Sequence, residues 1–377
     1  MIKKIFSYKS DRKYITINIL GIKITIKKNI YKEFIKHKIP DNSVLIIEFN
    51  PYHGETLPGF IKYFEDLNYN IDILIDSTLY KDKALSNFNY KKLNKIFVFN
   101  KFDIINNILL FPVIKKYNIV FFNSYVFTLD NKRQSIFVYK EKVLDNMNKY
   151  ICVEHNAFYD FERNIDKNRT VTLLPNSFCS KYINPHYYFE KKLNNKNKIT
   201  KFAIFAREEN SLKNIQLLID SVKKIIDIGI NNFNLILVGR INKLNIDITG
   251  YEKYIAFTGY LDYESLYKEV QLSDFILPML DPNIEDHKRF LEDVSGTFQL
   301  IYGFGKIPII HSFFSYRYGF NKENALIYNN NDELVESIKY AINMDNDEYL
   351  QKSKMIFEYS DILYKESLEN LKYMSEN

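Results

Sequence analysis

The chain has 377 residues, of which 46% are hydrophobic and 26% are charged, and this composition excludes a disordered, collagen-like or disulfide-scaffolded protein. At roughly 150 residues per domain, the length predicts two folded domains. The net charge is only +6, so we expect no nucleic-acid partner, while a peripheral contact with an anionic membrane surface is left open.

The cysteines and the amino terminus bear on the cellular compartment. Cys152 and Cys179 are too few and too far apart for a zinc motif or a disulfide framework, which favours a reducing cytosol. The basic amino terminus is not followed by the apolar core of a signal peptide. No run of about eighteen apolar residues is free of charge, so no membrane span is expected. We therefore expect a cytoplasmic protein, with a peripheral position at the inner face of the membrane as a further option.

Residues 1–40 are expected to form a small amino-terminal β-hairpin ahead of the main fold. The segment 15–28 alternates apolar and polar residues with a period of two, and Gly21 divides it into two arms. Such a hairpin would be an appendage rather than part of either domain.

Residues 41–190 are expected to form the first α/β domain. The apolar run 43–49 is typical of a strand that is buried on both faces of a parallel sheet, and apolar residues at helical spacing follow from Leu57 to Leu67. The alternation then continues with strands at 71–75, 96–99, 119–122 and 151–154, and with a helical stretch around 104–117.

Residues 191–345 are expected to form a second α/β domain, because periodicity fades between about 175 and 200 and resumes after it. Asn210 or Ser211 is expected to cap its first helix. Strands are expected at 201–206, 233–238, 254–258, 275–279 and 307–310, with helices at 263–270 and after Ser295. Residues 346–377 are expected to form a helix that crosses back over the first domain. Two such domains would face a central cleft at the carboxyl ends of their strands, where ligands bind in open α/β sheets.

The strongest group of candidate binding residues opens the second domain. Arg207 ends its first strand, and Lys213 and Asn214 begin the following helix. Together with the free helix N–H groups, these cations could clamp a diphosphate. The alternative is that Arg207 pairs with Glu208 or Glu209 while Lys213 is solvated.

A second candidate phosphate site begins the helix after Ser295. Ser295, Gly296 and Thr297 would offer a hydroxyl group and bare backbone amides at a helix amino terminus. The alternative is that Ser295 is a plain N-cap.

The first domain carries candidate catalytic residues after two of its strands. His53, Gly54, Glu55 and Thr56 follow the buried strand 43–49, and His155 follows strand 151–154. Gly54 allows close backbone approach, and His53 or Glu55 could act as a general base on an acceptor hydroxyl group.

The other histidines are weaker candidates. His37, His186 and His287 fall in polar segments, where solvation is the expected state, and His311 at the end of a strand is left open. The acidic loop from Asp281 to Asp293 shows no regular metal-ligand spacing.

Several segments, taken in order, resemble a known family. FAIFAREENSLKNIQLLIDSVKKII is similar to the second-domain opening of GT-B glycosyltransferases, particularly those of glycosyltransferase family four. FNLILVGR, FTGYLDYESLYKEVQLSDFILPML and SGTFQLIYGFGKIPII fit the next family segments, and HGE at 53–55 resembles the opening loop of certain bacterial polysaccharide glycosyltransferases. The resemblance covers about residues 43–340. It implies the GT-B fold, with two Rossmann-like domains facing a central cleft, and a nucleotide-diphosphate sugar as the donor substrate, such as a UDP-sugar.

The resemblance also implies roles for individual residues. It assigns His155 to the donor sugar, and the loop of Gly259, Tyr260 and Leu261 to the base and ribose, although Tyr260 could be a packed aromatic. The other donor-binding positions would be Arg207, Lys213, Asn214, Gly239, Arg240, Ser295, Gly296 and Thr297. The sequence departs from the family where two glutamates are common, because Asp293 and Ile301 stand there. Glu292 or Asp293 could serve the donor sugar instead.

These observations lead to an expected function. The resemblance implies transfer of a sugar to a bacterial cell-surface glycan or glycolipid, as in lipopolysaccharide or capsule biosynthesis, without a cofactor or bound metal ion. The basic amino-terminal hairpin resembles a lead-in found ahead of several such transferases. Two alternatives stay open: a nucleotide-sugar epimerase on the same scaffold, and a non-catalytic GT-B binding module. A dehydrogenase is disfavoured because no Gly-x-Gly-x-x-Gly follows either first strand.

Overall fold

A computed structural model of the chain shows three sheets among the residues that it describes, of three, six and six strands. The described residues are 6–10, 14–19, 22–27, 30–99, 112–124, 144–145, 147–155, 166, 168–177, 179–188, 191–206, 214–239 and 247–376.

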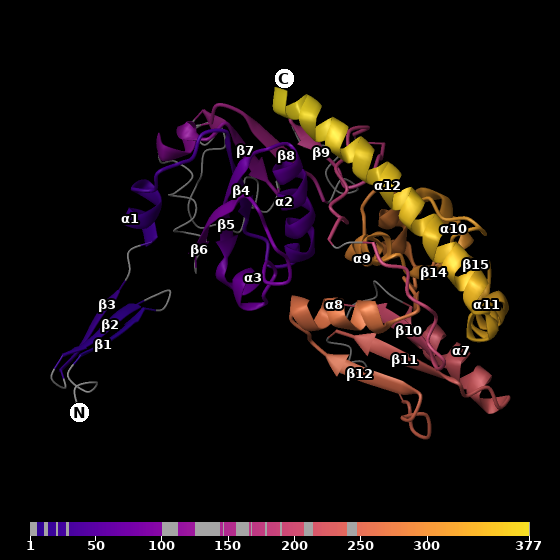
Figure 1. Cartoon of the computed structure of the whole chain (residues 1–377). Helices are drawn as coiled ribbons and strands as arrows, with labels where there is room; N and C mark the ends of the chain where they lie inside the picture. Colours follow the sequence, from indigo (N-terminus) through magenta and orange to yellow (C-terminus); the bar gives the residue numbers. More distant parts are fainter. Residues whose placement is uncertain are drawn as a thin grey trace.

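The small amino-terminal sheet stands apart from the rest of the chain (Figure 1). It is antiparallel, in the order β1 (Phe6–Ser10), β2 (Tyr14–Ile19) and β3 (Ile22–Lys27), and the short helix α1 (Ile30–Ile35) follows it. The predicted hairpin is confirmed for β2 and β3. The third strand, β1, escaped prediction because its five residues give too short an alternation to be recognised without its partner.

The first domain is a parallel six-stranded sheet in the order β6-β5-β4-β7-β8-β9. Its elements are β4 (Ser43–Glu48), η2 (Gly54–Thr56), α2 (Leu57–Asp66), β5 (Asn70–Asp76), α3 (Ser77–Lys81), β6 (Leu93–Phe99), η3 (Pro112–Lys116), β7 (Ile119–Phe122), β8 (Tyr150–Val153) and β9 (Thr170–Val171). The apolar strands are buried as predicted. Of the predicted helix 104–117, the described part holds the five-residue 3-10 helix η3, and residues 104–111 lie outside the described residues.

The second domain repeats this plan in the order β12-β11-β10-β13-β14-β15. Its elements are β10 (Thr200–Phe205), α7 (Ile215–Asp227), β11 (Phe233–Val238), β12 (Ile255–Gly259), α8 (Tyr263–Leu272), β13 (Phe275–Ile276), η6 (Glu285–Leu291), α9 (Gly296–Phe304), β14 (Ile307–His311), α10 (Ser312–Ser315), η7 (Tyr316–Tyr318), β15 (Leu326–Tyr328) and α11 (Asn331–Asn343). Strand β13 is shorter than predicted, because Pro278 has no N–H to donate to the ladder and Met279 takes a left-handed conformation with φ 51°.

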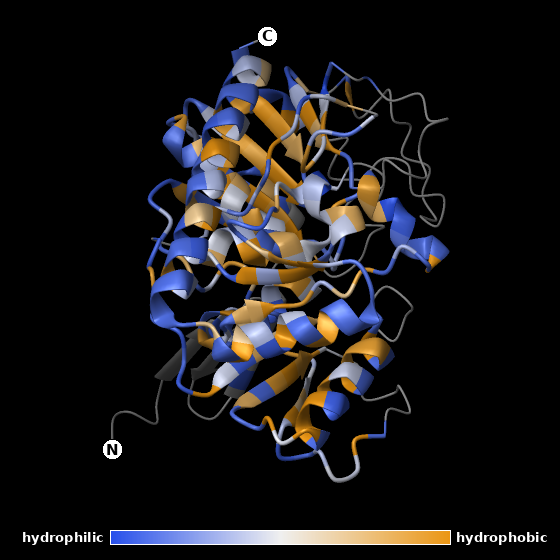
Figure 2. Cartoon of the chain, turned by 90° about the vertical axis from the view of Figure 1, so that its right-hand side faces the viewer, coloured by the Kyte–Doolittle hydropathy of each residue, from blue (hydrophilic) through white to orange (hydrophobic). Residues whose placement is uncertain are grey.

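The carboxy-terminal helix α12 (Asn346–Glu376) lies along both domains, and Figure 2 shows its mixed apolar and polar faces. Near its start, Ser353 donates a hydrogen bond to the Gly305 carbonyl oxygen at 2.7 Å. Near its end, Ser367 accepts one from the Asn184 N–H at 2.9 Å, and the Ser375 carbonyl oxygen accepts one from Lys149 at 2.8 Å. The helix therefore links the second domain to the first.

The segment that connects the domains is buried between helices α2 and α9. A Cβ atom at Gly59 of α2 would lie 2.0 Å from the Pro185 carbonyl oxygen, and one at Gly303 of α9 would lie 2.5 Å from the His186 carbonyl oxygen. Glycine at both positions lets the helices approach the connection. Two parallel Rossmann-like sheets, joined by this connection and by α12, confirm the predicted GT-B fold class.

Two histidines predicted to be solvated are buried, so that prediction is wrong. His186 lies in the connection against Asn184 and the Ser360 carbonyl oxygen, and burial lowers its pKa to about 3. His287 accepts a hydrogen bond from the Asp281 N–H at 2.8 Å. The prediction rested on the polar residues next to these histidines in the sequence. It failed because a loop that packs beneath a helix buries side chains whatever their neighbours in the sequence are.

Candidate functional site

Two predicted catalytic residues meet at one edge of the first sheet. Strands β4, β7 and β8 are neighbours, so the residues after them share the carboxyl edge. The rings of His53 and His155 stack there, with 4.0 Å between centroids and 14° between planes. The structure thus brings together two histidines that are about a hundred residues apart in the sequence.

The proton on His155 can be placed from its hydrogen bond. Its Nε2 lies 2.6 Å from the Asn123 carbonyl oxygen, and because a carbonyl only accepts, Nε2 must carry the hydrogen. Burial, followed by the neighbouring His53, holds the pKa of His155 well below its usual range. His155 is therefore neutral near pH 7, with a bare Nδ1 that can accept a hydrogen bond from a hydroxyl group.

Glu55 connects this cluster to the second domain. Its carboxylate lies 3.7 Å from His53 Nδ1 and accepts a hydrogen bond from the Tyr263 hydroxyl group at 3.3 Å. A Cβ atom at Gly296, the first residue of α9, would lie 3.0 Å from Glu55 Oε1. One at Gly54 would lie 2.7 Å from the Tyr263 oxygen, so glycine at both places permits the contact. A carboxylate of the first domain thus reaches the amino terminus of α9.

A buried polar network beneath the histidines was not found from the sequence. Glu48, the last residue of β4, accepts hydrogen bonds from the Asn50 N–H at 2.6 Å and the Ser124 hydroxyl group at 2.8 Å. Asn123 bonds both Glu48 and Thr56. The one available signal was a glutamate inside an apolar strand.

The amino terminus of α9 shows the N-cap geometry of the alternative interpretation. The Ser295 hydroxyl oxygen accepts the Thr297 N–H at 3.4 Å, and Thr297 is buried. The phosphate role of Ser295, Gly296 and Thr297 stays a prediction.

The predicted diphosphate clamp is described in part. Asn214 caps α7 by accepting the Leu217 N–H, and its amide donates to Asp281 at 2.8 Å. Arg207, Lys213 and Arg240 lie outside the described residues.

The predicted base-binding loop takes part in backbone and domain contacts. The Gly239 N–H donates to the Gly259 carbonyl oxygen at 3.0 Å, and both glycines have positive φ. Tyr260 donates a hydrogen bond to Asp82 of the first domain, and Leu261 packs against the core. Their contacts with a base or ribose stay predictions.

The carboxylates offered for the donor sugar bind protein groups. Glu292 accepts the Ser177 N–H at 2.9 Å. Asp293 is buried, with Oδ2 3.3 Å from Arg289 Nε. A sugar contact would require either carboxylate to exchange these bonds.

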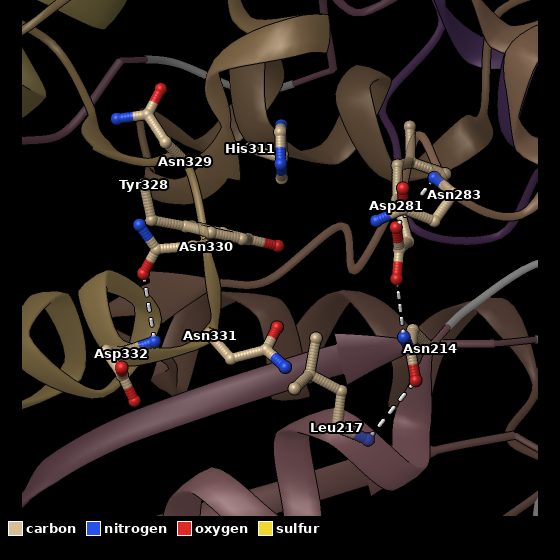
Figure 3. A pocket seen from close by; sticks show the side chains of 11 residues that line it. Asn214, Leu217, Asp281, Asn283, His311, Tyr328, Asn329, Asn330, Asn331 and Asp332 are labelled. Atoms are coloured by element: carbon tan, nitrogen blue, oxygen red, sulfur yellow. Dashed lines mark hydrogen bonds between the residues drawn. The ribbon is translucent and has the colours of Figure 1, made fainter.

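A polar pocket of about 320 Å³ lies at the carboxyl edge of the second sheet (Figure 3). It adjoins the position between β10 and β13 where the strand order reverses, which is where open α/β sheets bind ligands. The Asn214–Asp281 hydrogen bond borders it. The lining also includes His311, which the sequence left open, and Leu280, Asn283, Tyr328, Asn330 and Asp332, which sequence reasoning missed.

Two absences hold for the described part of the chain. No group of three or more His, Cys, Asp or Glu side chains there could hold a metal ion. No helix there has the length and apolar character needed to cross a membrane.

Comparison with known proteins gives similarity of structure alone. No family model matches this chain, and no curated protein sequence matches it. Among solved structures, it is similar to the glycotransferase of kitacinnamycin (8% identity, TM-score 0.48, covering 89% of this chain and 100% of that one). It is also similar to WaaG, a glycosyltransferase involved in lipopolysaccharide biosynthesis (12% identity, TM-score 0.45, covering 89% of this chain and 100% of that one). A third similar structure is that of S. aureus MnaA with UDP (15% identity, TM-score 0.48, covering 83% of this chain and 91% of that one). Such low identities leave activity and substrate to be argued from this chain's own residues.

Proposed function

We propose that the chain is a glycosyltransferase that moves a sugar from a nucleotide-diphosphate donor to a hydroxyl group of a glycan or glycolipid. One observation carries the proposal: Glu55, which lies 3.7 Å from His53 of the stacked His53–His155 pair in the first domain, meets the amino terminus of α9 in the second. Such a junction offers proton acceptors on one side and a positive helix end on the other.

The proposed reaction uses each side for one task. The acceptor hydroxyl oxygen bonds to the anomeric carbon, while the bond from that carbon to the phosphate oxygen breaks. Glu55 or His53 takes the hydroxyl proton, and the nucleoside diphosphate leaves with the bonding electron pair. The α9 amino terminus, together with the predicted cations Arg207 and Lys213, stabilises the negative charge that develops on the phosphate. His155 orients the sugar through its bare Nδ1.

Binding of the donor is the first test. We expect purified protein to be stabilised by one family of nucleoside diphosphates, by about 2.7 kcal/mol at a hundred times the dissociation constant. The donor that stabilises it should then release nucleoside diphosphate in step with transfer to an acceptor. No thermal shift with any nucleotide or nucleotide sugar would contradict the proposal.

We further propose that the acceptor belongs to a bacterial surface glycan and that the amino-terminal segment contacts the inner face of the membrane. Residues 1–40 contain 11 Lys or Arg and two Asp or Glu, so their net charge is +9, against +6 for the whole chain. The register aligns Tyr8, Ile17 and Ile24 across the three strands. A basic segment with an apolar pattern suits an anionic lipid surface.

Vesicle sedimentation tests the membrane proposal. We expect the full chain to bind vesicles that contain phosphatidylglycerol and not pure phosphatidylcholine. The double substitution Lys23→Gln and Lys27→Gln should weaken binding about tenfold or more, since each lysine near such a surface contributes about 1 kcal/mol. Equal binding to both vesicle types would refute the contact.

A further inference from the structure

We propose that Glu48 is a positioning residue that holds His53 and His155 in their stacked arrangement. Its effect on catalysis rests on the proposed function, whereas its effect on the histidines does not. Glu48 ends β4 and is wholly buried, so it acts on the site through other residues rather than by touching substrate.

Both carboxylate oxygens of Glu48 are engaged. Oε1 accepts the Asn50 N–H at 2.6 Å, where the loop leading to His53 begins. Oε2 accepts the Ser124 hydroxyl group at 2.8 Å and the Asn123 amide at 2.5 Å. One carboxylate therefore ties together the carboxyl ends of β4 and β7.

Asn123 carries this constraint to both histidines. Its carbonyl oxygen accepts the His155 Nε2–H at 2.6 Å. Its side-chain amide donates to the Thr56 hydroxyl oxygen at 2.7 Å, and that hydroxyl group donates to the His53 carbonyl oxygen at 2.7 Å. Asn123 therefore links each histidine to Glu48.

The charge on Glu48 is sensitive to its surroundings. Burial raises the pKa of Glu48 to about 7, against the lowering effects of His53 and of the hydrogen bonds from Ser124 and Asn50, while Glu55 raises it slightly. The two residues that follow β8 are Glu154, which is buried, and His155, which is neutral. The Asn50 N–H, the Asn123 amide and the Ser124 hydroxyl group all donate hydrogen bonds to the Glu48 carboxylate. The ionised carboxylate can accept all three bonds, whereas a proton on Glu48 would occupy one oxygen and weaken the bonds to it.

Nitrogen-15 NMR of the histidine rings tests the positioning directly. In wild type we expect a single neutral Nε2–H tautomer for His155 at pH values above about 7, where Glu48 is ionised. Glu48→Gln replaces one accepting carboxylate oxygen with an NH₂ group that donates. The Asn123 side-chain amide must then flip or lose its hydrogen bond to residue 48. The His155 and His53 signals should then shift and show mixed tautomers. Asp274→Asn is the matched control, because Asp274 is also buried and accepts two backbone N–H groups, but in the second domain.

The pH dependence of transfer gives a second readout. Transfer by wild type should decline as pH falls through about 7, because Glu48 then takes up a proton. In Glu48→Gln we expect kcat about 10 to 100 times lower, a donor KM within about twofold of wild type, and no acid limb near pH 7, as for other residues that orient a site. Ser124→Ala carries little folding risk and should move the limb to higher pH, because it removes a bond that lowers the pKa of Glu48.

The outcomes separate the two proposals. If Glu48→Gln leaves the histidine signals unchanged, or if Ser124→Ala leaves the acid limb in place, Glu48 does not position the pair. If the histidine signals shift as expected while wild type transfers no sugar from any donor, the positioning holds and the proposed function fails.

Discussion

At the scale of single residues, the two stacked histidines have different hydrogen-bonding partners and therefore suit different roles. The Asn123 carbonyl oxygen fixes the tautomer of His155, and burial keeps the ring neutral. His53 lies instead within reach of the Glu55 carboxylate, which also contacts Tyr263 of the other domain. Orientation of substrate therefore suits His155, and proton acceptance suits the His53–Glu55 side.

The first prediction concerns Glu55. Glu55→Gln removes one of the two groups that we propose for uptake of the acceptor proton. If Glu55 is the base, we expect kcat to fall by a factor of about 10² to 10⁴ with donor affinity largely kept. Steady-state kinetics of nucleoside diphosphate release measures both quantities. Glu285→Gln, at an exposed carboxylate, is the control and should keep its rate. A Glu55→Gln enzyme with wild-type turnover would remove Glu55 from the mechanism.

The second prediction concerns pH and stability. The pKa of His186 is about 3 in the folded chain, below its value in the unfolded chain, so the unfolded chain binds more protons between about pH 6.5 and 3. This histidine therefore lowers the free energy of unfolding as pH falls through that window. Urea unfolding at pH 7 and pH 5 should show a smaller loss for His186→Asn than for wild type. An equal loss in both would mean that His186 is not buried as a neutral ring.

Residue-scale sequence reasoning succeeded where position along a strand decides. His53 and His155 each follow a buried strand, and parallel strands bring such residues to one edge. It failed for Glu48, Asn123 and His186, because burial of a polar side chain depends on what packs over it rather than on its neighbours in the chain.

At the scale of elements, helix α9 meets different groups at its two ends. Gly296 at its start lies against the Glu55 side chain, whereas Gly303 lies against the backbone of the domain connection. A side chain can move aside, and a packed backbone cannot.

The third prediction uses these two glycines. Gly296→Ala should displace the Glu55 carboxylate and lower turnover, with the free energy of unfolding within about 1 kcal/mol of wild type. Gly303→Ala places a Cβ atom 2.5 Å from the His186 carbonyl oxygen and should destabilise the chain by more than about 1 kcal/mol. Chemical denaturation and transfer rates on both variants check this. The reverse pattern would show that α9 and the connection are packed differently.

The fourth prediction concerns helix α12, which links the domains. Ile356 is 0% exposed and Ile362 is 51% exposed on the same helix, so they form a matched pair. Ile356→Ala should cost about 2 to 5 kcal/mol in free energy of unfolding, and Ile362→Ala clearly less. Equal losses in urea denaturation would contradict the packing of α12 against the two domains.

At the scale of the whole molecule, the two-domain plan could be predicted because buried parallel strands give continuous apolar runs, as in 43–49 and 201–206. The contacts between the domains could not. Lys83 bridges Asp262 at 2.9 Å and Glu264 at 2.7 Å, although about 180 residues separate the partners and surface charges carry no pairing signal in a single sequence.

The contacts between the domains determine how the first-domain and second-domain residues of the candidate site are placed relative to one another. The Tyr263 N–H donates to the Asp82 carbonyl oxygen at 3.0 Å, and the Tyr263 hydroxyl group reaches Glu55. One residue at the start of α8 therefore joins the domain interface to the candidate site, so a change in how the domains pack would be felt at Glu55.

The measurement that tests the central claim most directly is the rate of sugar transfer by His155→Asn beside His37→Asn. His37 is bonded to Asp72 away from the stacked pair. Both variants are assayed with the stabilising donor at saturation and with membrane glycolipid extract as the acceptor. We predict that His155→Asn loses about a hundredfold or more in turnover while nucleotide still stabilises it, and that His37→Asn transfers at the wild-type rate. Wild-type turnover in His155→Asn would contradict the assignment of the active centre to the edge where the two domains meet.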